Sequence, residues 1–545
     1  MKSSRMFFLF ALFLFVALAA ACGEDRAAPD AGSQADAFDA GGDVASDAGL
    51  DGEADAGFDA GDAGTDGGGD LELDAGADAG ADGGGDAEGE DGSQAQGDDG
   101  GADDGGADDG GADDGGTGGD WMPPELSRAQ QWVRDNPMFI SALTVQMGDP
   151  PDAFVNDYFD NFHANAVHLW QTGLPNTMNG WADAGRSDFR FVAWTRDDGT
   201  SVDGGELIGG YPADAPGRIA YQIGDEPANM QDMYALEEGF EAIRAHDPDA
   251  LLILNFSFSA DNIEEILDYY VDQMDGDIVS YDLYSRSSGV YRTLGMFREA
   301  ALRAKMPYWR YMNSYLAADL EQRHHESDQR WDAFSGLVYG YTGHSWFIYQ
   351  ITSNHDLYPI LFETGDAFDA AKTSAWAMHA QINQEMANLG RAITVLTSTE
   401  IRYVPTLSWF PPEGTVIWEQ GAGGDPYITA LEPAPDQLAL EILVGFFRDD
   451  YGEFYTMVQN VRHEHGEFPI NNDEEGSIRI VFDFSGAPSS LDRNALLSLN
   501  KLTGQVEVVP MSQVQGDVAT LDIVLAAGDP FLFKYITGQA FALQP

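Results

Sequence analysis

The residues of this chain with the clearest potential for acid–base chemistry are two adjacent carboxylates, Asp225 and Glu226. They follow a short apolar run at 219–223. A carboxyl group at the end of a buried strand can have its pKa raised by its surroundings, which lets it donate a proton to a poor leaving group. A further carboxylate, Asp282, lies near the end of another apolar run, 278–283. These positions are the first candidates for a catalytic site.

Short apolar, β-branched or aromatic runs recur through the middle of the chain, spaced by the length of a strand–loop–helix–loop unit. Amphipathic helical stretches fill several of the gaps. The pattern predicts an α/β fold with eight parallel strands, and eight is the number that closes a (β/α)8 TIM barrel. An open doubly wound sheet is the alternative, but no Gly-x-Gly-x-x-Gly follows the first run. The runs are 138–145, 166–170, 191–194, 219–223, 251–256, 278–283, 307–311 and 345–351.

The hydrophobic pattern of the sequence changes after a long helical stretch at 367–390. From residue 401 onward, alternating strand-like segments are separated by turn residues. The segments are 402–404, 415–418, 445–447, 455–460, 477–484, 506–509, 520–525 and 530–535. This spacing is typical of an antiparallel β-sandwich. We therefore predict a barrel over 121–395 and a β-sandwich domain over 396–545.

In a barrel of this kind, the chemistry lies at the C-terminal ends of the strands. The predicted strand ends carry carboxylates, aromatic rings and amides together. Such residues build sugar sites, because aromatic faces stack on pyranose rings while carboxylates and amides pair with hydroxyl groups. We predict a poly- or oligosaccharide partner, bound by Asp225, Trp170, Trp194, Tyr284, Asn313 and Tyr349.

The segment 221–227, Tyr-Gln-Ile-Gly-Asp-Glu-Pro, resembles the end of the fourth strand in the large clan of (β/α)8 glycoside hydrolases. In that clan a Glu followed by Pro is the general acid/base, so the resemblance implies this role for Glu226. The resemblance extends over most of residues 125–540, and the branch of the clan that the chain resembles most is the β-galactosidase-like one. It implies cleavage of O-glycosidic bonds, and we expect no cofactor and no metal. Other similar segments are 165–170, 277–284, 340–347, 382–390 and 525–530.

Two positions depart from the clan's pattern. The clan has Asn before the acid/base, where this chain has Asp225, and it has a nucleophilic Glu at the end of the seventh strand. Residues 305–315 contain no carboxylate, and Asn313 stands in that region. Asp282 is the best substitute as base or nucleophile, although it could instead orient a neighbouring side chain. The weaker choices are Asp197, Asp198 and Asp356.

The missing seventh-strand Glu leaves other classes of function open. One is a non-catalytic carbohydrate-binding surface lipoprotein, and another is an adhesin that displays the barrel on a tether. Retaining hydrolysis places two carboxyl groups about 5–5.5 Å apart, and inverting hydrolysis about 6.5–9.5 Å apart. A second carboxylate within about 10 Å of Glu226 would therefore favour an enzyme, and a Glu226 without a partner would favour a binder.

The first 22 residues have the pattern of a bacterial lipoprotein signal peptide. Lys2 and Arg5 precede an unbroken apolar run of 16 residues, 6–21, which is too short to span a bilayer comfortably. The run ends at Cys22, the single cysteine of the chain, and the local sequence resembles the lipoprotein cleavage box. We expect an exported protein with a lipid on Cys22, at the outer membrane, the cell surface or the periplasmic face.

Residues 23–120 have the composition of a disordered tether. From 24 to 120 there are 31 acidic residues and one basic residue, set among Ala, Gly and a few Ser. Such a segment cannot bury enough apolar surface to offset its chain entropy, and its charges repel one another. With 27 basic and 92 acidic residues, the chain carries a net charge of −65, which argues against nucleic acid as a partner.

Overall fold

In the computed structural model the described part of the chain runs from residue 121 to 544. The predicted signal peptide, Cys22 and the linker lie outside it. None of the helices in the described part is both long and apolar enough to cross a membrane. The gaps within it are 145–149, 170–180, 183, 196–216, 259–261, 285–288, 318–324, 351–356, 366, 406–410, 436, 438–439 and 464–474.

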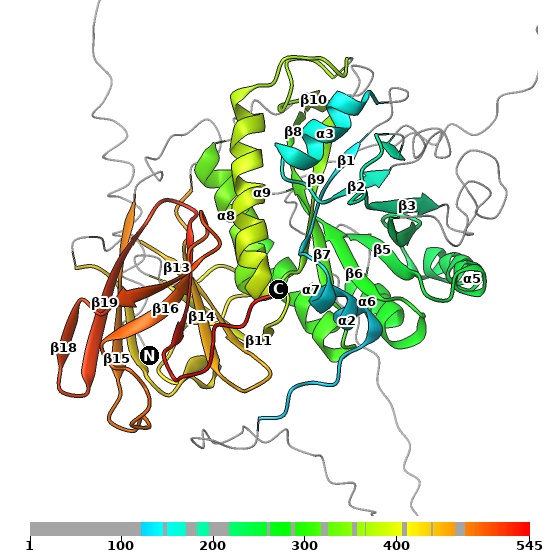
Figure 1. The fold of residues 1–545 in the computed structure, drawn as a ribbon. Helices are drawn as coiled ribbons and strands as arrows, with labels where there is room; N and C mark the ends of the chain where they lie inside the picture. The colour runs from blue at the N-terminus through cyan, green and yellow to red at the C-terminus, as the bar shows by residue number, and fades with distance from the viewer. Residues whose placement is uncertain are drawn as a thin grey trace, which may run out of the picture. The chain divides into compact units, whose positions relative to one another are not determined.

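Eight parallel strands form a closed barrel, which confirms the predicted (β/α)8 fold (Figure 1). Each strand coincides with one of the eight apolar runs to within a few residues. The eighth barrel strand is β9, because a small two-stranded sheet of β8 (Tyr315–Ala317) and β10 (Leu357–Pro359) is added at its flank. The barrel strands are β1 (Phe139–Thr144), β2 (Ala166–Leu169), β3 (Phe191–Thr195), β4 (Arg218–Ile223), β5 (Leu251–Ser257), β6 (Ile278–Asp282), β7 (Tyr308–Asn313) and β9 (Gly343–Gln350).

A polar side chain sets the start of one of the helices between the strands. The helix after β4 begins at the cap residue Asn229, whose side chain accepts hydrogen bonds from the backbone N–H groups of Gln231 and Asp232. Such a cap satisfies donors that have no partner inside the helix. The helices are α2 (Arg128–Asp135), α3 (Asp152–Asp160), α5 (Met230–His246), α6 (Ile263–Gln273), α7 (Val290–Arg303), α8 (Glu326–Tyr339) and α9 (Ser374–Ile393).

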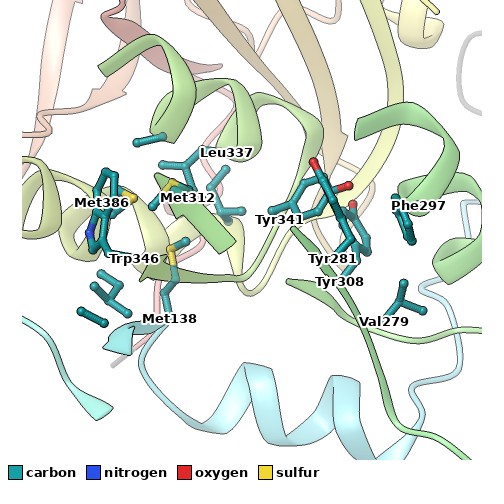
Figure 2. Packing of buried hydrophobic residues seen from close by; sticks show 14 of the residues in the cluster. Met138, Val279, Tyr281, Phe297, Tyr308, Met312, Leu337, Tyr341, Trp346 and Met386 are labelled. Carbon is teal, nitrogen blue, oxygen red and sulfur yellow. The ribbon is translucent and has the colours of Figure 1, made fainter. Parts of the chain in front are cut away.

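Aromatic side chains fill much of the space between the barrel and its helices (Figure 2). Tyr281 of β6 stacks on Phe297 of α7, with ring centroids 4.4 Å apart. Tyr341 meets Tyr281 edge-on at 5.9 Å. On the other side of the view, Trp346 is fully buried and donates its indole N–H to Asn383 of α9. Each buried ring contributes roughly 1.5–3 kcal/mol of hydrophobic stabilisation.

The C-terminal domain consists of two antiparallel sheets, as the alternating segments predicted. One sheet has six strands, in the order β11-β13-β14-β20-β16-β17, and the other has four, in the order β12-β15-β19-β18. Their apolar faces share one hydrophobic core. The strands are β11 (Thr397–Val404), β12 (Ile428–Pro433), β13 (Ile442–Arg448), β14 (Phe454–Asn460), β15 (Gly476–Asp483), β16 (Ala495–Leu499), β17 (Val506–Pro510), β18 (Gln513–Gln515), β19 (Val518–Leu525) and β20 (Pro530–Tyr535).

The sequence pattern misplaced part of this domain. We expected a strand at 415–418, but that segment makes only an isolated bridge between Tyr403 and Ile417. Three strands, β12, β16 and β18, were not expected. All three are short; β12 pairs with β15, β16 with β17 and β20, and β18 with β19.

A buried ion network joins the barrel helices to the C-terminal domain. Arg330 of α8 makes a two-pronged pair with Glu385 of α9, at 2.7 and 2.9 Å, and a third bond of 2.9 Å to Asp529. Lys501 reaches Glu385 at 2.6 Å and Asp529 at 3.0 Å. The Arg330 and Glu385 side chains are 7% and 1% exposed, so each charge depends on the others in place of water.

Gly528 allows the last turn of the domain to lie directly on α8. Its φ is +78°, and an added Cβ would stand 2.6 Å from the backbone oxygen of Ser327. Gln459 of β14 stabilises the same contact, because its side chain donates to the backbone oxygens of Trp331 and Gly528. The segment 525–530, one of those that resemble the glycoside hydrolase clan, is thus part of the junction between the barrel and the sheets.

Asp425 in the C-terminal domain should make stability depend on pH. Burial raises the pKa of this carboxyl to about 6, although the backbone N–H groups of Tyr427 and Ile428 and the hydroxyl of Tyr535 donate to it. The folded state therefore binds more protons than the unfolded state between about pH 4 and about pH 6, and stability falls as the pH rises through this window. We expect Asp425→Asn to reduce the fall in Tm between acidic and neutral pH.

Thermal melting across that pH range is the measurement. The matched control is Asp249→Asn, because Asp249 is exposed. A parent and an Asp425→Asn protein whose melting curves move in parallel with pH would contradict this prediction.

Candidate active site

Three carboxylates meet at the C-terminal ends of β4 and β6. Asp225 and Glu226 follow β4 and are exposed, whereas Asp282 ends β6 and is only 7% exposed. Glu226 and Asp282 are hydrogen bonded to each other, and the charge of Asp225 acts on Asp282. The structure therefore brings together the three carboxylates that the sequence singled out, and Glu226 has a carboxyl partner.

The backbone that presents Glu226 is constrained. Gly224 has a φ of +66° and Glu226 a φ of +45°, so the chain turns sharply at the end of β4. A side chain in this left-handed region costs of order 1 kcal/mol. The backbone N–H of Glu226 donates to the carbonyl oxygen of Asn255 at 2.9 Å, which holds the turn against β5. Backbone strain of this kind is concentrated at functional sites.

The environment of Asp282 favours its protonated form. Burial raises its pKa well above the usual range, and the charge of Glu226, the hydrogen bond to Glu226 and the charge of Asp225 act in the same direction. A hydrogen bond from Asn255 opposes them. Two carboxyl groups in contact cannot both ionise easily, so Asp282 retains a proton in its hydrogen bond with Glu226 at pH values where an ordinary carboxylate has lost it.

Two amide side chains donate hydrogen bonds to the carboxylates. Asn255 of β5 donates from Nδ2 to Asp225 Oδ1 and to Asp282 Oδ1, at 3.1 Å in both cases. Gln222 of β4 donates to Asp225 Oδ1 at 3.2 Å. The site residues Gln222 and Asn255 were not among our predicted binding residues. A polar residue inside a buried apolar run was the available signal.

A buried hydrogen-bond network that includes Gln222 crosses the barrel. The hydroxyl of Tyr311 on β7 lies 2.8 Å from Gln222 Oε1, to which it donates, and 2.6 Å from His168 Nδ1 on β2. These strands are not neighbours, so the three side chains must point into the barrel. Burial lowers the pKa of His168 to about 3, which keeps its ring neutral. The network gives Gln222 a fixed orientation.

A cluster of half-buried aromatic rings borders the carboxylates. Tyr284 lies 5.5 Å from Tyr315 and 5.5 Å from Phe347, and Tyr315 lies 5.6 Å from Phe347, measured between ring centroids. Burial raises the pKa of Tyr284, and the charges of Asp282 and Asp225 act in the same direction, which indicates that this ring lies near the acids. Tyr284 was predicted as a binding residue, whereas Tyr315 and Phe347 were not.

The remaining predicted residues do not all lie beside the carboxylates. Trp194 is the residue before the last one of β3, and its ring lies 5.8 Å from the His168 ring, but it is only 5% exposed. Asn313 ends β7 and accepts a hydrogen bond from the backbone N–H of Tyr315. The structure does not bring Tyr349 to the group: it is 1% exposed and packs against the α3 ring of Tyr158. Trp170, Asp197, Asp198 and Asp356 lie outside the described residues.

Metal ligands do not gather anywhere in the described part of the chain. No group of three or more His, Cys, Asp or Glu side chains in that part is arranged to hold an ion. The ring of His463 instead stacks on Trp331, with ring centroids 4.2 Å apart.

Comparisons with known proteins found similarity at the level of structure only. No protein-family model matches the chain, and no curated protein resembles it in sequence. A glycoside hydrolase family 5 protein from Bacteroides vulgatus is similar, with 11% identity over 75% of this chain and 92% of that one and a TM-score of 0.45. A GH30 endoxylanase from Clostridium papyrosolvens has 10% identity over 73% and 97% of the two chains, with a TM-score of 0.36. An endo-β-1,4-mannanase from Thermotoga petrophila has 10% identity over 65% and 97%, with a TM-score of 0.34.

The site combines a proton donor, a carboxyl partner and flat apolar surfaces. The exposed member of the pair, Glu226, can reach a ligand, and the buried member, Asp282, retains a proton at pH values where an ordinary carboxylate has lost it. The half-buried rings beside them offer faces on which a sugar ring can stack. This arrangement is suited to protonating the leaving oxygen of a carbohydrate.

Proposed function

We propose that this chain is an exported, lipid-anchored glycoside hydrolase that cleaves O-glycosidic bonds of a poly- or oligosaccharide. The observation that carries the proposal is the hydrogen-bonded carboxyl pair of Glu226 and Asp282 at the C-terminal rim of the barrel. A partner for Glu226 is the feature that favours an enzyme over a sugar-binding barrel that has lost catalysis. The aromatic cluster around Tyr284 supports a carbohydrate ligand.

In this proposal Glu226 is the general acid. The glycosidic C–O bond breaks as its oxygen takes a proton from Glu226, which shares its proton with Asp282. The oxygen of a water molecule bonds to the anomeric carbon, and a proton from that water returns to the carboxyl pair. Protons and atoms then balance, and the pair is ready for another cycle.

In known glycoside hydrolysis, retaining enzymes separate the two carboxyl groups by about 5–5.5 Å and inverting enzymes by about 6.5–9.5 Å. Because Glu226 is exposed, its side chain can rotate relative to Asp282 without disturbing the core.

The proposal is tested by incubating the purified protein with a panel of plant, algal and bacterial polysaccharides and measuring new reducing ends. We expect release from at least one of them. Binding without release from any member of the panel would support the rival function, a carbohydrate-binding surface lipoprotein.

The lipid anchor is a separate part of the proposal. It rests on the single cysteine of the chain, Cys22, which directly follows the apolar run of the signal peptide. We expect labelled palmitate to enter the protein in bacterial cells and Cys22→Ser to abolish the labelling. Equal labelling of the two proteins would contradict the anchor and leave the enzymatic proposal untouched.

A further inference from the structure

The side chain of Asn255 occupies a unique place among the three carboxylates. It is 4% exposed and points into the barrel from β5. Its Nδ2 carries two hydrogens and lies 3.1 Å from Asp225 Oδ1 and 3.1 Å from Asp282 Oδ1. Its backbone carbonyl accepts the N–H of Glu226 at 2.9 Å. One residue therefore contacts all three acidic residues.

The orientation of this amide is set by Ser280. Asn255 and Ser280 face each other in the register of β5 and β6, and the Ser280 hydroxyl donates to Asn255 Oδ1 at 3.2 Å. An amide that accepts at Oδ1 from this side must direct both N–H bonds toward the carboxylates. Gln222 does not substitute for it, because the carboxylate to which Gln222 donates is Asp225.

We infer that Asn255 is the positioning residue of this site, and that its amide holds Asp225 and Asp282 in register while its backbone holds Glu226. The inference rests on the proposed function for its catalytic meaning, although the geometry exists without substrate. Hydrogen bonds from an amide stabilise carboxylate charge, and they fix the direction of the acceptor oxygens. Without the bond from Asn255, Asp282 would lose a hydrogen bond that opposes the effects of its burial and its acidic neighbours on its pKa.

Two substitutions separate the donor role from the size of the side chain. Asn255→Asp keeps the shape and replaces both N–H donors with a further acceptor, and Asn255→Ala removes the donors without adding charge. We expect kcat/KM on a cleaved polysaccharide to fall by about 10- to 100-fold in each, as expected for a lost hydrogen bond to a charged group. Ser280→Ala should have a smaller effect in the same direction.

Asn161→Asp is a matched control. The Asn161 amide also donates to a carboxylate, Asp157, at 2.8 Å, but on the exposed end of α3. The same exchange of amide for carboxylate should leave activity unchanged there. Thermal melting of each variant identifies a protein that has simply lost its fold.

A readout independent of activity is the titration of Asp282, followed by carbon-13 NMR of the labelled side-chain carboxyl groups. Because Asn255 lowers the pKa of Asp282, both Asn255 variants should titrate Asp282 at a higher pH than the parent, and Asn161→Asp should not. Titration of Asp282 at the same pH in the parent and in Asn255→Ala would overturn the inference. If the parent cleaves no polysaccharide, the proposed function fails, while the titration still decides the role of Asn255.

Discussion

Replacing Glu226 with glutamine is expected to lower kcat/KM for polysaccharide cleavage by about 10²- to 10⁴-fold, because general acid catalysis contributes that much. Glutamine has nearly the same shape, but it cannot deliver the proton that the leaving oxygen needs. The assay is release of reducing ends, with substrate binding measured alongside. Binding should persist because the aromatic cluster and the amides remain.

The control for this substitution is Glu238→Gln on the exposed surface of α5, which should retain full activity. The pH profile gives an additional check. Since the pKa of Asp282 is raised, the shared proton should be lost only as the pH rises through that raised value, and kcat/KM should fall on the alkaline side. Equal activity of parent and Glu226→Gln would remove Glu226 from the mechanism.

Replacing Arg330 with methionine is expected to destabilise the protein by about 3–5 kcal/mol, because it leaves buried carboxylates without their main partner. Glu385 and Asp529 would then share only Lys501. The pKa of Glu385 is lowered in the parent, mainly because its hydrogen bonds and charge pairing with Arg330 outweigh the opposing effect of burial. The free energy of unfolding, measured with denaturant, should therefore fall sharply.

A matched substitution tests whether burial is the reason. Arg303 on α7 pairs with Asp268 on the surface, where the two side chains are 52% and 59% exposed. We expect Arg303→Met to cost less than about 1 kcal/mol, as exposed ion pairs usually do. If the two substitutions cost the same, the network around Arg330 does not hold the barrel and the C-terminal sheets together.

The barrel could be predicted because its signal is local. Each parallel strand is buried on both faces and so forms a continuous apolar run, and the runs around 219–223 and 278–283 became β4 and β6. Strands β12 and β16 escaped prediction because neither segment alternates clearly between apolar and polar residues, although β16 pairs with the next strand in the sequence, β17. Local pattern alone does not reveal such pairing.

The site was predicted in part. Asp225, Glu226 and Asp282 were found because strand ends in a barrel converge, and their contact is present in the structure. Tyr349 shows the limit of that reasoning. Side chains alternate between the two faces of a strand, so a residue near the end of β9 can point toward the helices instead of the site. Tyr349 does so, against Tyr158.

The sequence by itself determined the barrel, the change to antiparallel sheets and the carboxylates at the ends of two strands. The reason is that buried strands appear in the sequence as apolar runs at regular spacing, and that turn residues separate them. Only the tertiary structure decided that Asp282 touches Glu226, that Asn255 joins the acids and that Tyr311 meets His168 across the barrel. These contacts join strands that are distant in sequence. They depend on which face of each strand points inward once the barrel has closed.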